Sequence, residues 1–208
     1  MRFTLVTDGP TDSVLCRHIE WLLKKHVGLV PVESQWAEFR WLREPPTDLA
    51  SKIAKAAELY PCDVLFVHRD AETEEPERRR DEIHAAVGKA RLKVSQVCVI
   101  PVRMTEAWLL FDEAAVRWAA GNPNGEAELG LPHARAETLP NPKAVLHKAL
   151  VTACGLAGRR RRTFDISQAV HQVAEYIDDF SPLLALPAFQ ALEKEVLAVL
   201  RNHPELCS

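Results

Sequence analysis

The sequence predicts an α/β fold in which a mostly parallel sheet is flanked by helices and followed by a helical carboxy-terminal extension. Two apolar runs, at residues 3–7 and 64–67, are continuous rather than alternating, which is typical of parallel strands buried on both faces. Segments with helical periodicity separate the predicted strands as far as residue 104. Beyond it the strand pattern disappears. We therefore expect an α/β core over residues 1–104 and a helical extension packed on that core over residues 105–208.

The predicted core alternates strands and helices along the chain. After the first strand, residues 12–27 carry apolar side chains at helical spacing, and Thr11 or Asp12 is a suitable cap. Residues 29–41 are rich in aromatic and other strand-forming residues, so we expect a second strand within them. The remaining core elements are expected in the order helix, strand, charged helix and strand, at residues 47–59, 63–67, 74–92 and 94–102.

The predicted extension consists of helices. Helical patterns occur at residues 105–120, 142–153, 166–177 and 187–201. Glycine, proline and asparagine are frequent over residues 121–142, which is typical of an irregular loop. Within the first of these helical segments, we expect Trp108 to pack in the interior. We expect Asp112 to cap the helical turn that follows it.

Composition narrows the classes of protein to consider. The formal net charge is -3, which argues against a surface that is basic throughout but leaves room for a local basic groove. The five cysteines contain no Cys-x-x-Cys pair, so we expect reduced thiols rather than disulfides or a zinc ribbon. The sequence has no apolar run of membrane-spanning length and no signal-peptide pattern. These features predict a cytoplasmic protein without a membrane partner.

Acidic residues follow two of the predicted strands. Asp8 and Asp12 come directly after the first strand, and Asp70 and Glu72 come after the strand at 63–67. The carboxyl ends of parallel strands meet at one edge of a sheet, where ligands of open α/β folds bind. Gathered carboxylates repel one another and need a cation, and oxygen ligands suit Mg²⁺ or Mn²⁺. The pattern favours metal-assisted phosphoryl chemistry; the alternative is a turn followed by a helix cap.

The same residues carry a resemblance to a known family. A strand that leads into Asp8-Gly9-x-Thr11-Asp12, and a later strand that leads into Asp70-x-Glu72, resemble a Toprim domain. In that family a Glu-Gly turn follows the first strand and an Asp-x-Asp pair follows a later one. The run TEAWLLFD at residues 105–112 is similar to the Glu-x-Trp-Leu-Leu-x-Asp helix of small stand-alone Toprim-like proteins. Phe180-Ser181-Pro182 and residues 187–192 are also similar to the ending of that group.

The resemblance implies a Toprim-like, that is Rossmann-like, sheet and a nuclease that depends on Mg²⁺ or Mn²⁺. Its partner would be DNA or RNA, and it would act with a separate ATPase subunit in phage defence, with homo-oligomers also expected. The sequence contains no Walker-type phosphate loop, so an ATPase would be another chain. Asp8 stands at the position of the family's Glu, as a metal ligand or general acid/base. Asp70 and Glu72 stand at the paired aspartates that hold the metal.

Other residues complete the expected site. Glu106 follows the last predicted strand and is expected as a fourth catalytic carboxylate. The run Arg159, Arg160, Arg161 and Arg162 is expected to contact nucleic-acid phosphates, with a solvated loop as the alternative. His68 could orient a water molecule or shuttle a proton, with a structural hydrogen bond as the alternative.

Three departures from the family pattern leave a second function open. Asp8 is one methylene shorter than the family's Glu, Glu72 is one longer than its Asp, and Arg69 is a cation beside Asp70. Mg²⁺ requires near-octahedral geometry, so these changes would weaken binding. The alternative is a catalytically degenerate Toprim-like protein that serves as an interaction or regulatory subunit. A third option is a nucleotide- or anion-binding protein of flavodoxin-like topology.

Overall fold

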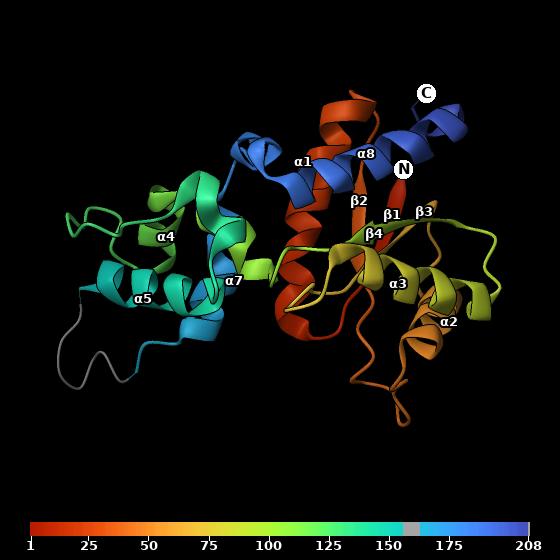
Figure 1. The fold of residues 1–208 in the computed structure, drawn as a ribbon, viewed down its shortest axis with the longest axis horizontal. Helices are drawn as coiled ribbons and strands as arrows, with labels where there is room; N and C mark the ends of the chain where they lie inside the picture. The colour runs from red at the N-terminus through yellow and green to blue at the C-terminus, as the bar shows by residue number, and fades with distance from the viewer. Residues whose placement is uncertain (156–162, 208) are drawn as a thin grey trace.

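The computed structural model describes residues 1–155 and 163–207, and within them it forms an α/β fold with a helical carboxy-terminal part (Figure 1). All strand pairs are parallel and the strand order is β2-β1-β3-β4. The predicted fold class, a parallel Rossmann-like sheet flanked by helices, is confirmed. The strands are β1 Arg2–Val6, β2 Glu33–Trp36, β3 Val64–His68 and β4 Ser95–Val99.

Successive side chains of each strand point to opposite faces of the sheet, and each face has its own hydrophobic cluster. Phe3, Leu5 and Phe66 belong to the cluster that includes helices α1 (Leu15–Val27) and α8 (Pro187–Asn202). We call this side of the sheet the α1 face. Val6, Leu65 and Val67 belong to the cluster on the other side, which we call the α2 face. Its helices are α2 (Leu49–Leu59) and α3 (Pro76–Ala90), which lie side by side in Figure 1.

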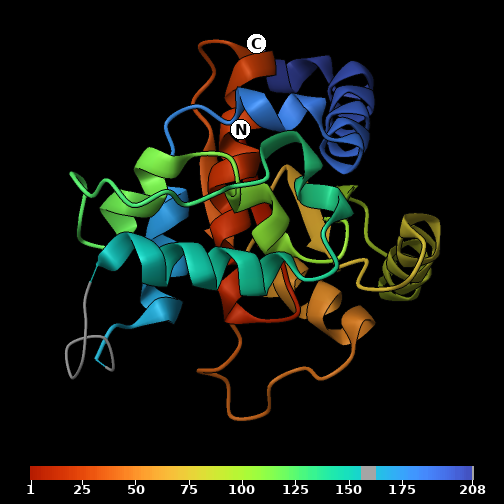
Figure 2. The same ribbon diagram turned by 60° about the vertical axis from the view of Figure 1, so that its left-hand side comes forward.

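The helices of the carboxy-terminal half pack around one another and against the α1 face. Helices α4 (Glu113–Ala119), α5 (Pro142–Cys154) and α7 (Ile166–Tyr176) contact one another, as Figure 2 shows. One cluster of buried side chains includes residues of these helices together with residues of β1 and α1. The short 3₁₀ helices are η1 Pro10–Val14, η2 Thr105–Leu109, η3 His133–Thr138, η4 Ser181–Ala185 and η5 Pro204–Cys207.

The segment predicted as one helix over residues 105–120 is two elements. A 3₁₀ turn, η2, ends at Leu109, and α4 starts only after Asp112. The Asp112 carboxylate accepts a hydrogen bond from the Ala115 backbone N–H at 2.9 Å, so the predicted cap is confirmed. Trp108 is fully buried, as predicted, and packs edge-on against Phe189 with ring centroids 5.1 Å apart.

Helix α8 returns to the sheet and covers the outer edge of β4. The Glu195 carboxylate accepts a hydrogen bond from the backbone N–H of Cys98 at 2.8 Å. Its other oxygen accepts one from Nε of Arg80 on α3 at 2.9 Å. A charged side chain at an exposed strand blocks pairing with other strands. Among helices of the described residues, none is long and apolar enough to cross a membrane.

Candidate metal centre

The strand order places the ends of β1 and β3 at a topological switch point. From β1 the chain continues to β2 on one side of it, whereas β3 lies on its other side. Open α/β sheets bind ligands in the crevice beyond the carboxyl ends of strands at such a point. Asp12 lies in η1, just after β1, while His68 is the last residue of β3 and Asp70 follows it. The topology therefore brings these side chains to one place.

Three side chains form a group that could hold a metal ion. One ligand atom from each of Asp12, His68 and Asp70 lies within 4.8 Å of the other two. Nε2 of His68 is 3.1 Å from Oδ1 of Asp70, and Nδ1 of His68 is 3.8 Å from Oδ2 of Asp12. We call this group the Asp-His-Asp cluster. Among the described residues, no other group of three His, Cys, Asp or Glu side chains meets this distance criterion.

Thr105 contacts all three members of the Asp-His-Asp cluster. Its backbone N–H donates to Oδ1 of Asp70 at 2.9 Å. Its hydroxyl oxygen lies 3.2 Å from Oδ1 of Asp12, 3.2 Å from Nε2 of His68 and 3.3 Å from Oδ1 of Asp70. Thr105 is itself buried. A hydroxyl has one proton and two lone pairs, so it can bridge donors and acceptors at such a junction.

Backbone pairing beyond the strands sets these positions. The segment that follows β3 remains hydrogen-bonded to the segment that follows β4: the N–H of Ala71 donates to the carbonyl oxygen of Pro101 at 3.0 Å. The N–H of Glu72 likewise donates to Arg103 O at 2.8 Å. Glu72 and Arg103 both have positive φ, 53° and 62°, a conformation that is unfavourable for residues other than glycine. The paired turns carry Asp70 and Thr105 into contact.

The electrostatic environment of the cluster favours a bound cation. Burial raises the pKa of the Asp12 carboxyl above its usual value, and the charge of Asp70 raises it further. The interaction with His68 and the hydrogen bond from Thr105 act in the opposite direction. A positive charge placed among these groups would offset the repulsion between the two carboxylates.

The His68 ring contains the observation that tests whether a metal fits. Its side chain is only 1% exposed, and within the described part of the chain its Nδ1 atom has no hydrogen-bond partner. With the proton of a neutral ring on Nε2, facing Asp70, the Nδ1 lone pair faces the Asp12 carboxylate. A buried polar atom without a partner is unfavourable, and a metal ion would satisfy it. Opposite ligands of one ion at about 2.1 Å lie about 4.2 Å apart, so an ion fits between Nδ1 of His68 and Oδ2 of Asp12, which are 3.8 Å apart, while Asp70 faces Nε2 and orients the ring.

The structure places the other predicted site residues outside this cluster. Asp8 faces Nη1 of Arg69, with Oδ1 at 3.2 Å. Glu72 is paired with Nη2 of Arg79 at 3.2 Å, and its side chain is two-thirds exposed. Glu106 is buried, and Oε1 lies 3.6 Å from Nζ of Lys143. Of the four predicted catalytic carboxylates, Asp70 alone is a member of the cluster.

The alternation of side chains along a strand explains why Asp8 and Asp70 do not meet. Asp8 is two residues after Val6, which faces α2, so it continues on the α2 face. His68 is two residues after Phe66, which faces α1. Arg69 is two residues after Val67, which faces α2, so Arg69 also points to the α2 face, where it pairs with Asp8. Asp12 reaches the α1 face because the η1 turn begins in between.

Two other members of the cluster could have been selected from the sequence. Asp12 belongs to the acidic turn that follows the first strand, and His68 ends the strand at 63–67. Counting strand residues by twos from the apolar positions would have selected His68 and rejected Asp8. Thr105 carried no comparable signal, since its role depends on the paired turns. The run Arg159–Arg162 lies outside the described residues.

Comparison with known proteins identifies no relative of this chain. No protein-family model matches it, and neither a curated protein nor a solved structure does.

Proposed function

We propose that this protein is a divalent-metal-dependent phosphodiester hydrolase, a nuclease acting on DNA or RNA, with Asp12 and Nδ1 of His68 as metal ligands and Asp70 as the carboxylate that orients the His68 ring through Nε2. The observation that carries the proposal is the convergence of these three side chains at the switch point, with Nδ1 of the buried His68 lacking a hydrogen-bond partner among the described residues. The resemblance of the acidic turns to a Toprim domain supports phosphodiester chemistry.

The donor set favours Mn²⁺ over Mg²⁺. Carboxylate oxygens suit both ions, whereas an imidazole ligand suits transition metals. When bound, the ion would neutralise phosphate oxygens and activate a water molecule. Thr105 would fix the orientations of both carboxylates, through its N–H to Asp70 and its hydroxyl to Asp12. Second partners of this kind orient metal ligands.

The test combines metal binding with cleavage. Mn²⁺ and Mg²⁺ are titrated calorimetrically into the wild-type protein, Asp70→Asn and His68→Gln. Labelled single- and double-stranded DNA and RNA are then incubated with the same proteins. We expect Mn²⁺ binding and Mn²⁺-dependent cleavage in the wild type and the loss of both in the two variants. Asp81→Asn, a change at an exposed aspartate on α3, is the matched control and retains both. Wild-type protein that binds neither ion would contradict the proposal.

One observation favours the alternative of a degenerate Toprim-like interaction subunit. Asp8, at the position of the family's Glu, is neutralised by Arg69 and lies 3.7 Å from Nζ of Lys52. A carboxylate engaged by two cations is not a free base or ligand. Under this alternative the wild-type protein binds the ion or a protein partner but cleaves no nucleic acid.

The biological setting is proposed on the resemblance alone. It comprises a cytoplasmic location, phage defence, a separate ATPase partner and homo-oligomers. Cleavage is therefore measured with and without any ATPase encoded beside this protein. An increase in cleavage that needs ATP would support the partnership.

A further inference from the structure

We propose that Lys52 and Arg69 form a binding site for a phosphate group of the nucleic-acid backbone, and that Asp8 is the internal counter-ion of this site. The proposal rests on the proposed function only for the source of the phosphate. It concerns the α2 face of the sheet edge, whereas the Asp-His-Asp cluster lies on the other side of the strand ends.

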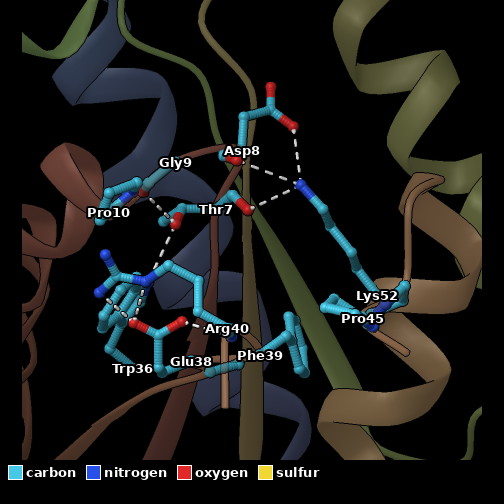
Figure 3. Close-up of a pocket in the computed structure, with 12 residues that line it drawn as sticks. Thr7, Asp8, Gly9, Pro10, Trp36, Glu38, Phe39, Arg40, Pro45 and Lys52 are labelled. Carbon is cyan, nitrogen blue, oxygen red and sulfur yellow. Dashed lines mark hydrogen bonds and ion pairs between the residues drawn. The ribbon is translucent and has the colours of Figure 1, made fainter. Parts of the chain in front are cut away.

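Both cations converge on a single oxygen atom of Asp8. Nη1 of Arg69 lies 3.2 Å from Oδ1, and Nζ of Lys52 lies 3.7 Å from the same oxygen. Lys52 reaches there from α2, and Nζ is also 3.2 Å and 3.4 Å from the backbone carbonyls of Asp8 and Thr7 (Figure 3). One anionic oxygen between an ammonium and a guanidinium is an arrangement that a phosphate oxygen would reproduce.

The two cations are held in place more firmly than the anion between them. The side chains of Lys52 and Arg69 are 17% and 27% exposed, whereas that of Asp8 is 44% exposed. The carbonyl groups hold Lys52, and Glu82 Oε2 lies 3.6 Å from Nη2 of Arg69. The buried Nε of Arg69 has no hydrogen-bond partner in the described part of the chain. Asp8 can therefore turn toward solvent while both cations stay positioned.

The surface around Lys52 and Asp8 can accommodate the sugars and bases on either side of a bound phosphate. Lys52 and Asp8 line a cavity of about 140 Å³ whose other walls include Trp36 and Phe39 (Figure 3). Arg40 lies over the Trp36 ring, 5.9 Å from its centroid. Aromatic rings and guanidinium planes are the groups on which unpaired bases stack. Because these groups can contact bases as well as a phosphate, single-stranded nucleic acid is the ligand we propose.

The proposed phosphate site also adjoins the metal ligands. Gly9 lines the same cavity, and a Cβ atom added to Gly9 would lie 3.8 Å from Oδ2 of Asp12. On the other side, Arg69 borders a hollow of about 350 Å³ that Lys89 and Glu82 also line. Because Asp8 and Arg69 are in contact, their ion pair joins the two hollows. A strand lying along them would be separated from Asp12 of the Asp-His-Asp cluster by Gly9.

The experiment measures binding in the absence of metal. A fluorescein-labelled oligothymidylate is titrated with protein in EDTA, and anisotropy gives the dissociation constant at several salt concentrations. We expect Asp8→Asn to tighten binding several-fold, because it frees two cations. We expect Lys52→Gln to weaken it about tenfold. The slope of log K against log salt then falls by about 0.7, the value for one lost phosphate contact on a single strand.

Two controls complete the experiment. Lys52→Arg keeps the charge and retains binding. Lys55→Gln removes a lysine of the same helix that is paired with Glu58, and it leaves binding unchanged. Inorganic phosphate added as a competitor displaces the oligonucleotide only at high concentration if the ligand is the nucleic-acid strand. If it displaces the strand at comparable concentration, the ligand is free phosphate and the proposed nucleic-acid site is overturned.

An Asp8→Asn variant that binds the oligonucleotide no better than the wild type would overturn the proposal. So would a Lys52→Gln variant that binds equally well. Mn²⁺ titration of Asp8→Asn separates this result from the proposed function, because Asp8 is not a member of the cluster and metal binding should persist. Loss of Mn²⁺ affinity in Asp8→Asn would instead assign Asp8 to the metal, which also contradicts its role as a counter-ion.

Discussion

Nδ1 of the buried His68 ring lies 3.8 Å from Oδ2 of Asp12, too far for a hydrogen bond and with no other partner among the described residues. In the neutral ring with its proton on Nε2, a lone pair therefore faces a carboxylate. Two electron-rich atoms at this separation are stable together when a cation or proton lies between them. This relationship leads to the first prediction.

Mn²⁺ should stabilise the wild-type protein against heat, and His68→Gln should remove the effect. At a concentration one hundred times the dissociation constant, ligand binding adds about 2.7 kcal/mol. For a protein of this size that corresponds to a rise of about 5–10 °C in Tm. Differential scanning calorimetry with and without Mn²⁺ measures it, with Asp81→Asn as the control. An equal rise in His68→Gln would exclude His68 as a ligand.

Thr105 should act through the metal ligands rather than through the core. Thr105→Val keeps the shape but removes the hydroxyl that lies 3.2 Å from both Asp12 and His68. We expect it to lower Mn²⁺ affinity about 10–100-fold, as is usual for partners of metal ligands. Thr105→Ser keeps the hydroxyl and should retain most of the affinity. Calorimetric titration distinguishes the variants, and equal affinities would show that the hydroxyl has no positioning role.

Protein stability should decrease in mild acid because of His18. Burial lowers the pKa of His18 from 6.5 to about 4, although its two ring nitrogens face the carbonyls of Val14 and Trp108. The unfolded chain binds a proton below about pH 6.5 and the folded chain only below about pH 4. The free energy of unfolding should therefore fall by about 3 kcal/mol between these pH values. Urea denaturation at pH 7 and pH 4.5 measures the change.

The matched variant for this experiment is His18→Asn, which does not titrate. Its unfolding free energy should depend less on pH than that of the wild type, although its stability at pH 7 is lower. A wild-type curve that is flat from pH 7 to pH 4.5 would contradict the buried, neutral state of His18.

The cysteine thiols should differ widely in reactivity. Burial, with the nearby charge of Glu195, raises the pKa of Cys98 to about 12, and burial raises that of Cys16 to about 12 as well. Only the thiolate reacts with a disulfide reagent, so both should react slowly at pH 8. Cys207 is exposed. We expect one fast equivalent in a reaction with a chromogenic disulfide, removed by Cys207→Ser; rapid reaction of Cys98 would contradict its burial.

Glu195 should contribute to stability at the edge of the sheet. Glu195→Ala removes the acceptor for the Cys98 N–H and leaves Arg80 without this partner. A buried donor without an acceptor costs about 1–3 kcal/mol, so the midpoint of urea denaturation should fall accordingly. Glu126→Ala, at an exposed position, is the control and should leave the midpoint unchanged. Equal midpoints for the two variants would show that the contact with β4 is not stabilising.

Much of the fold was accessible from sequence because local patterns determined it. The continuous run Val64-Leu65-Phe66-Val67 is a strand buried on both faces, and Asp112 caps a helix as its position indicated. The break between η2 and α4 was missed, since the periodicity of residues 105–120 does not reveal a change from 3₁₀ to α geometry.

The candidate site was only partly predictable. The parallel strands predicted from the sequence place the acidic residues at one edge of the sheet. Which of them belong to the Asp-His-Asp cluster depends on the face of the sheet that each side chain reaches. Asp8 and Asp12 lie four residues apart in one turn, yet Asp8 contacts Arg69 and Asp12 faces His68. That separation is produced by the η1 turn, whose geometry no short sequence pattern specifies. Thr105 depends on pairing between two distant turns, which is a property of the whole fold.

The clasp that Arg80 and Glu195 form around β4 has a consequence for self-association. With that margin closed, the opposite strand, β2 at Glu33–Trp36, is the boundary where another backbone could add to the parallel ladder. If copies of this chain associate through their sheets, the contact is made by β2 of each copy. Because each sheet then has one open edge, the assembly ends at a dimer.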